Sequence, residues 1–236
     1  MKSRKKHVSF GLFYALVIGT LLLSTLVGSR AVTVISENLP IDRQHTIVID
    51  AGHGGEDGGA TSCTGVLESR FNLEIALRLN DLFHLLGYDT LMIRTSDTAI
   101  YTQGSTIGQK KVSDLKERVR IVNETENGLL LSIHQNFFAD SRFGGAQVFY
   151  AATADSEALA KQLQSTFVAA LNPGSNRRSK KASGIYLMEH ISVTGVLIEC
   201  GFLSNPEEEA KLRTPEYQKK LCCTVAATVS QYLSNT

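Results

Sequence analysis

Four residues of the types that hold metal ions or move protons stand out in the sequence. His53 and His134 each follow a short apolar run, Glu199 ends a third such run, and Glu68 precedes a stretch with helical periodicity. In an open α/β sheet, ligands bind where the strands end, so residues delivered to those ends converge. Because imidazole and carboxylate groups are common zinc ligands, the pattern predicts a metal site of the hydrolytic kind.

The four residues divide naturally into three ligands and one acid/base. A hydrolytic zinc ion takes three protein ligands and leaves one position for water, and His53, Glu68 and His134 supply the three. Bound zinc lowers the pKa of water from 15.7 to about 7. Glu199 has no obvious cationic neighbour in the sequence, so it suits the general acid/base that takes a proton from water and returns it to the leaving amine.

Each of these residues also has a structural explanation when it is taken alone. A histidine that ends an apolar strand is often a hydrogen-bonded core residue, and a glutamate that opens a helix often serves the helix dipole. The glycine-rich turn around His53 would also suit a phosphate, but it lacks the GxGxxG spacing and the P-loop lysine. The joint occurrence of the four favours the metal site. The other histidines are assigned to the tail (His7) or to structural roles (His45, His84 and His190).

Strand-like and helix-like segments alternate from residue 46 onward. We predict strands at 46–50, 88–94, 129–134, 145–151 and 194–199, and helices at 71–86, 114–126, 156–171 and 215–233. This alternation predicts one α/β domain with a largely parallel or mixed sheet and helices on both faces. Residues 95–113 and 172–184 resist assignment. The second of these segments is interpreted as a solvated loop, although its basic residues could meet substrate carboxylates: Arg177, Arg178, Lys180 and Lys181.

The first 44 residues are expected to lie outside the folded domain. Residues 1–7 form a basic tail, and residues 8–27 are an uncharged stretch long enough to cross a hydrocarbon core of roughly 30 Å. Basic residues before an apolar run mark the cytoplasmic side. We therefore expect a transmembrane anchor at 8–27, a tether at 28–44 and an extracytoplasmic domain at 45–236. Secretion after cleavage of residues 8–27 as a signal is the alternative.

Charge and cysteine content exclude other classes. Residues 1–30 hold five of the 24 basic residues and none of the 23 acidic ones, so the rest of the chain has a net charge of −4. A mildly acidic body argues against nucleic acid as a partner. The four cysteines show no CxxC spacing and are interpreted as small buried hydrophobes, with disulfide formation left open: Cys63, Cys200, Cys222 and Cys223.

Three segments resemble the zinc-dependent N-acetylmuramoyl-L-alanine amidases of bacterial cell walls: DAGHGGEDGGA at 50–60, SIHQN at 132–136 and LIECGFLSN at 197–205. The resemblance extends from about residue 46 to the C-terminus. It implies a mixed six-stranded sheet, Zn²⁺ bound by His53, Glu68 and His134, and Glu199 as the catalytic glutamate. Asn136 is a candidate substrate contact. The implied reaction is hydrolysis of the amide that joins N-acetylmuramic acid to L-alanine in peptidoglycan.

Two further segments are similar to the germination-specific, CwlD-type branch of that family: GAQVFY at 145–150 and GIYLM at 184–188. This likeness implies that peptides are stripped from spore cortex ahead of muramic-δ-lactam formation. A muramic-acid deacetylase would then be the functional partner that completes the lactam.

Two positions depart from the family pattern, which usually has lysine where this chain has Ser69 and alanine where it has Phe137. Loss of a cation beside Glu68 could loosen the metal, so weak zinc retention, or an accessory protein that orders the site, is a hypothesis. No autoinhibitory extra helix is evident between His134 and Glu199, which predicts that no segment plugs the site. Two other functions stay open: a peptidoglycan-binding module with impaired chemistry, and a zinc peptidoglycan deacetylase or carboxypeptidase.

Overall fold

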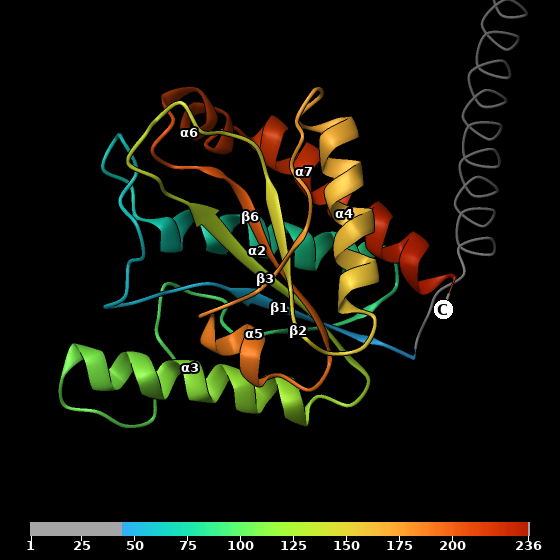
Figure 1. Cartoon of the computed structure of the whole chain (residues 1–236). Coiled ribbons are helices and arrows are strands. Elements are labelled where there is room, and N and C mark those ends of the chain that lie inside the picture. The colour runs from blue at the N-terminus through green and yellow to red at the C-terminus, as the bar shows by residue number, and fades with distance from the viewer. Residues whose placement is uncertain (1–43, 236) are drawn as a thin grey trace, which may run out of the picture. The chain divides into compact units, whose positions relative to one another are not determined.

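The computed structural model describes residues 44–235 (Figure 1). The predicted basic tail and membrane segment, and nearly all of the tether, lie outside the described residues. Within the described part, no helix is both long enough and apolar enough to span a bilayer.

A six-stranded sheet forms the centre of the fold. Its strands are β1 (Thr46–Ala51), β2 (Asp89–Met92), β3 (Gly128–Asn136), β4 (Gln147–Tyr150), β5 (Lys180–Lys181) and β6 (Thr194–Phe202), in the order β2-β1-β3-β6-β4-β5. All neighbouring pairs are parallel except β4 and β6, which are antiparallel. The predicted mixed, mostly parallel sheet is therefore confirmed.

Helices cover both faces of this sheet, as predicted (Figure 1). Helices α2 (Glu68–Leu85), α4 (Ser156–Ala170) and α7 (Pro215–Leu233) pack on one face, where Ile47 and Ile49 of β1 join the larger core. Helices α3 (Ile107–Glu124) and α5 (Tyr186–His190) pack on the other, where Val48 contacts the smaller core. Burial on both faces explains why the central strands read as continuous apolar runs.

Helix α3 begins earlier than predicted, at Ile107 instead of Asp114. A capping box sets this start: the Gln109 amide N–H donates to the Thr106 hydroxyl, and the Gln109 side chain accepts from the Thr106 N–H, both over 3.3 Å. The first turns of α3 are solvent-exposed and carry little apolar periodicity, which is why the sequence pattern missed them.

Three short elements were not predicted. Strand β5 has two residues and α5 has five, which is too short for a periodic signal. The seven-residue helix α6 (Pro206–Leu212) starts at Asn205, whose side chain accepts from the N–H groups of Glu207 and Glu208. Strand β6 also runs three residues past its predicted end, to Phe202, so Glu199 lies inside the strand.

The segment 172–184 is more ordered than a solvated loop. Arg177 donates from Nε to the Gly144 carbonyl over 2.9 Å, and its guanidinium lies over the Phe202 ring. Lys180 and Lys181 form the edge strand β5 and are exposed. All four cysteines are free, but only Cys200 and Cys222 are buried, so the interpretation as buried hydrophobes is wrong for the exposed pair, Cys63 and Cys223.

Candidate metal centre

His53 lies two residues beyond β1, in a backbone conformation that non-glycine residues seldom adopt. Its φ is +62°, in the left-handed region. Two contacts hold it there: its carbonyl accepts from Nη2 of Arg118 over 2.8 Å, and its ring Nδ1 lies 2.9 Å from Oδ2 of Asp57. The conformation directs the other ring nitrogen, Nε2, toward Glu68, 3.3 Å from Oε2.

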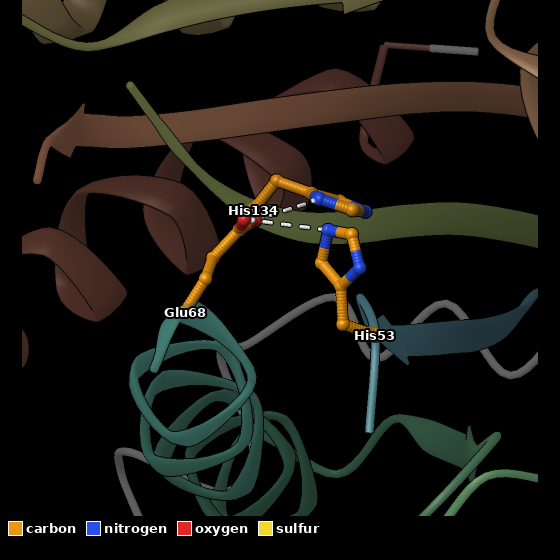
Figure 2. A group of neighbouring side chains, drawn as sticks. All are labelled: His53, Glu68 and His134. Atoms are coloured by element: carbon orange, nitrogen blue, oxygen red, sulfur yellow. Dashed lines mark hydrogen bonds and ion pairs between the residues drawn. The ribbon is translucent and has the colours of Figure 1, made fainter. Parts of the chain in front are cut away.

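His134 and Glu68 reach the same point from two other elements (Figure 2). His134 lies in β3, two residues before its end, and Glu68 is the first residue of α2. Nδ1 of His134 is 3.0 Å from Oε1 of Glu68. One ligand atom from each of His53, Glu68 and His134 can be chosen so that all three lie within 4.8 Å of one another. The three predicted ligands therefore converge.

The Glu68 carboxylate is oriented and kept ionised by its surroundings. Oε1 accepts from the Gln135 N–H and from Asn72 Nδ2, each over 3.2 Å, and Oε2 accepts from the Ala60 N–H over 3.0 Å. Burial favours the neutral acid, but the hydrogen bonds and charges of His134 and His53 outweigh it and hold the Glu68 pKa well below its usual range. The group is thus an anion fixed between two imidazoles.

Glycine at two positions makes this convergence possible. A Cβ on Gly52 would lie 2.2 Å from the His134 ring. A Cβ on Gly59, whose φ is +69°, would lie 2.6 Å from Oε2 of Glu68 and 2.7 Å from Cδ2 of His53. The chain is therefore shaped to bring two imidazoles and an anionic carboxylate around a small centre, and this donor set fits Zn²⁺.

Glu199 lies beside this cluster on the neighbouring strand. It is the register partner of His134 in the parallel pair β3 and β6. Its Oε2 is buried and has no hydrogen-bond partner among residues 44–235. Burial raises the Glu199 pKa to about 7, with Glu68 adding to the shift and the two histidines opposing it. A carboxyl with a pKa near neutrality is matched to proton transfer in both directions.

The sequence profile of the N-acetylmuramoyl-L-alanine amidase family matches residues 47–231. The chain belongs to this family. The amidase is 37% identical over 190 residues to the germination-specific N-acetylmuramoyl-L-alanine amidase of Bacillus subtilis, across 80% of this chain and 79% of that protein. It is 33% identical over 191 residues to the N-acetylmuramoyl-L-alanine amidase LytC of the same organism, across 79% of this chain and 35% of that longer protein.

The fold of the amidase is also similar to that of solved relatives. The CwlD amidase from Clostridioides difficile, solved in complex with the GerS lipoprotein, superimposes with a TM-score of 0.77 at 35% identity, covering 81% of this chain and 99% of that one. The resemblance seen in the sequence is therefore confirmed, and so is the enzyme class.

Two buried arginines, which sequence reasoning missed, brace the candidate metal centre of the amidase. Arg94 donates from Nε to the Ala51 carbonyl over 2.7 Å, and from Nη2 to the carbonyls of Gly52 and Ser69 over 3.0 and 2.9 Å. These bonds tie the end of β1 to the first turn of α2. The loop that carries His53 is thereby fixed to the helix that carries Glu68.

Arg118 braces the same loop from α3. It forms an ion pair with Asp50, donates from Nε to Asp114 over 2.6 Å, and donates to the carbonyls of Ala51 and His53. Burial would raise the Asp50 pKa, but the Arg118 charge and the hydrogen bond from Ser132 keep it below its ordinary value. No local pattern in the sequence indicates this cluster, because Asp50 is 64 residues from Asp114 and 68 from Arg118.

A pocket of about 80 Å³ opens beside the two imidazoles. Charged and polar walls come from His53, His134, Asp57 and Lys111, and α5 with its preceding residue contributes an apolar wall through Ile185 and Leu187. This unpredicted helix therefore shapes access to the site. The prediction that no segment plugs the site stays a prediction.

The other residues singled out in the sequence lie in different environments. Asn136 ends β3 and is partly exposed, so its role as a substrate contact stays a prediction. Ser69 is fully buried, with its hydroxyl unpartnered in the described part of the chain. Outside the cluster, His84 contacts Thr90 over 2.7 Å and His190 contacts the Tyr186 carbonyl over 2.8 Å. Both histidines are exposed, and their assignment to structural roles stays a prediction.

Proposed function

We propose that this amidase hydrolyses the muramoyl–L-alanine amide of peptidoglycan with a zinc ion held by His53, Glu68 and His134. The observation that carries the proposal is the convergence of these three side chains, from three separate elements, beside Glu199, whose Oε2 is buried and has no hydrogen-bond partner in the described part of the chain. When bound, zinc would supply a Lewis acid that polarises the scissile carbonyl and makes a water molecule more acidic.

In this proposal, Glu199 is the group that moves the proton. As an anion it accepts a proton from the attacking water, and it then delivers that proton to the amide nitrogen of L-alanine as the C–N bond breaks. Its raised pKa supports both steps, the acceptance of the proton from water and its donation to the amide nitrogen. Asp57 accepts from Nδ1 of His53, which leaves Nε2 with its lone pair available for the metal.

The two alternative functions are less well supported. A binding module with impaired chemistry has no need for a carboxylate oxygen such as Oε2 of Glu199, which is buried without a hydrogen-bond partner among residues 44–235, because such an atom costs stability. A zinc deacetylase or carboxypeptidase would use the same type of site, but the family match and the amidase relatives favour cleavage of the amide.

One experiment separates these functions by their products. Purified enzyme is incubated with peptidoglycan, and the soluble products are identified by mass spectrometry. We expect free stem peptides and peptide-free glycan. Release of acetate or of D-alanine in their place would reject the amidase mechanism.

We further propose a role in spore cortex. The germination-specific relative in Bacillus subtilis supports this role, because the match covers 80% of this chain and 79% of that protein. In this role the enzyme removes the stem peptide so that a muramic-acid deacetylase can complete the muramic-δ-lactam. Deletion of the gene is expected to remove muramic-δ-lactam from purified cortex, as measured by chromatography of digested cortex. Unchanged lactam content would reject this role.

An accessory protein is a related proposal. The relative from Clostridioides difficile was solved with a lipoprotein. In this chain the residue that follows Glu68 is Ser69, which carries no positive charge. We propose that a partner helps to retain zinc. Stoichiometric zinc in the purified enzyme after prolonged dialysis without any partner would reject it.

Peptidoglycan lies outside the cytoplasmic membrane, and the amidase therefore acts there. We propose that residues 8–27 anchor the chain and that residues 28–44 tether the catalytic domain 45–236 to the membrane. Fractionation of the producing cells tests this, since a cleaved and secreted enzyme would appear shortened in the medium.

A further inference from the structure

Three phenylalanine side chains are exposed on the loop that begins where β3 ends. Phe137, Phe138 and Phe143 have 50%, 52% and 47% of their surface accessible to solvent. Because a phenylalanine can bury roughly 150–250 Å², the three leave on the order of 300 Å² of aromatic surface in solvent. The largest apolar patch of a typical monomer is about 300–600 Å² and is often functional, and this surface reaches the lower end of that range. We call residues 137–143 the aromatic ledge.

The aromatic ledge is held in place by the chain that follows β6. The Phe138 N–H donates to Ser204 Oγ over 3.2 Å, and Asn205 Nδ2 donates to the Phe143 carbonyl over 3.3 Å. The Phe138 and Phe143 rings meet edge to face, with centroids 4.9 Å apart. Because the loop is already ordered, covering its rings would cost little conformational entropy.

The ledge lies next to the metal centre along the chain. Phe137 follows His134 by three residues, and three residues span at most about 10 Å. A molecule that covers Phe137 is therefore close to the scissile amide. The substrate of an amidase is a polymer whose glycan strand continues beyond the cleaved stem, and that strand is the part of the substrate that extends over neighbouring surface.

The polar residues of the ledge are also suited to a sugar. Asp140 and Arg142 lie between Phe138 and Phe143, and Arg142 donates from Nε and Nη2 to the Asp140 carboxylate over 2.9 and 2.6 Å. The Arg142 side chain is 89% exposed and keeps free donors. Aromatic rings contact the C–H faces of pyranoses, and planar polar groups bind their hydroxyl and acetamido groups. The opposite charges of the pair cancel, so the ledge offers contacts to sugar rings without a net charge of its own.

We propose that the aromatic ledge binds the glycan strand of peptidoglycan beside the scissile amide, with Phe137 and Phe138 stacked on sugar rings. The inference rests on the proposed function, because it takes its ligand from there. The ledge then gives the enzyme a preference for long glycan strands over single disaccharide units.

The test uses the zinc-loaded full-length chain and a double variant, Phe137→Ala with Phe138→Ala. Two substrates are compared: a single disaccharide that carries one stem peptide, and long glycan strands that carry the same stem. We expect kcat/KM on the long strands to fall about tenfold, mainly through a rise in KM. The ratio of kcat/KM on the long strands to kcat/KM on the single disaccharide should fall by a similar factor. Thermal denaturation checks that the variant is folded.

Leu85→Ala is the matched control. Leu85 is 81% exposed at the end of α2 opposite to Glu68, about 25 Å along the helix axis. Removing it deletes exposed apolar surface far from the site. The long-to-short ratio should stay at the value of the unmodified enzyme.

A binding measurement separates failure of this inference from failure of the proposed function. Peptide-free glycan strands are titrated into the Glu199→Gln variant, with and without the ledge substitutions, and we expect the substitutions to weaken binding about tenfold. If the unmodified enzyme releases peptides but the substitutions change neither binding nor the substrate ratio, the ledge does not bind glycan. If they abolish self-association of the chain and leave glycan binding intact, the ledge is an interface between copies, which also overturns the proposal.

Discussion

Glu199 lies directly opposite His134 across the parallel strands β3 and β6. Register partners in neighbouring strands project to the same face of the sheet, so the carboxyl of Glu199 and the imidazole of His134 share one side of it. This relationship follows from strand register alone. It explains how two residues 65 positions apart in the sequence come to lie side by side.

Replacing Glu199 by glutamine is expected to reduce kcat by about 10²–10⁴-fold, the usual contribution of a positioned acid/base. Zinc content and fold should be retained, because Glu199 does not belong to the ligand cluster. Peptide release from peptidoglycan is the measurement, and Glu126→Gln, an exposed glutamate that follows α3, is the control. Full activity in Glu199→Gln would remove the residue from the mechanism.

The same substitution should stabilise the metal-free protein at neutral and alkaline pH. Burial raises the Glu199 pKa from 4.5 to about 7, so the folded state holds a proton that the unfolded state has lost between those values. Stability therefore falls as pH rises from about 4.5 to about 7. Glutamine has no such proton, so the Tm of Glu199→Gln should exceed that of the unmodified chain above pH 7. The two Tm values should converge below about pH 4.5, and a constant difference would contradict the argument.

Much of the site could be predicted from sequence because its signals are local. The runs before His53 and His134 are apolar because β1 and β3 are buried on both faces. Ligand-binding residues in open α/β sheets lie at the carboxyl ends of the strands, which places both histidines at the same edge of the sheet. Glu68 was recognised because it precedes the apolar stripe of α2. The supporting residues were missed because their partners are distant in sequence: Arg94 and Arg118 contact main-chain carbonyls more than 20 residues away.

The unpredicted elements have a similar physical cause. The start of α3 depends on one pair of side-chain hydrogen bonds at Thr106 and Gln109, which a hydrophobic pattern does not register. Strand β5 exists only through pairing with β4, and α5 only through packing of Leu187 and Met188 against the sheet. Elements of this length are stabilised by tertiary contacts, so local sequence carries little information about them.

Arg118 is expected to control zinc affinity without touching the metal. Arg118→Lys keeps the positive charge beside Asp50 and Asp114 but cannot reproduce the several bonds of the guanidinium, including the one to the His53 carbonyl. We expect zinc affinity to fall about 10–100-fold, the usual effect of losing an outer contact to a ligand. Chelator competition measures the affinity.

A second variant tests the electrostatic part of that prediction. Arg118→Met leaves two buried carboxylates without their cation, and it should lower the free energy of unfolding by about 3–5 kcal/mol in urea denaturation. Arg120→Met is the matched control on the same helix. Arg120 is exposed and pairs with Glu117 and Glu124, so its loss should leave the free energy of unfolding nearly unchanged. Equal effects of the two substitutions would reject the role given to Arg118.

Removal of zinc should lower Tm by an amount that grows with pH. Burial alone would lower the pKa of His53, but the hydrogen bonds and charges of Asp57 and Glu68 raise it to about 9 in the metal-free protein. The ring must lose this proton to bind zinc, so apparent affinity should rise about tenfold per pH unit from about pH 6.5 to about pH 9. The raised pKa also means that protonated His53 stabilises the metal-free fold fully below about pH 6.5, and that this contribution is lost as pH rises through about 9.

The affinity and the stability of the metal-free fold change through the same His53 proton, so the sign of the prediction is fixed. Zinc at about 100 times its Kd stabilises by about 2.7 kcal/mol, which is roughly 5–10 °C in Tm for a domain of this size. The difference in Tm with and without chelator, at fixed free zinc, should therefore widen between about pH 6.5 and about pH 9. His190→Asn, which alters an exposed histidine outside the cluster, should show the same widening. A difference that narrows with rising pH would mean that His53 does not exchange its proton for the metal.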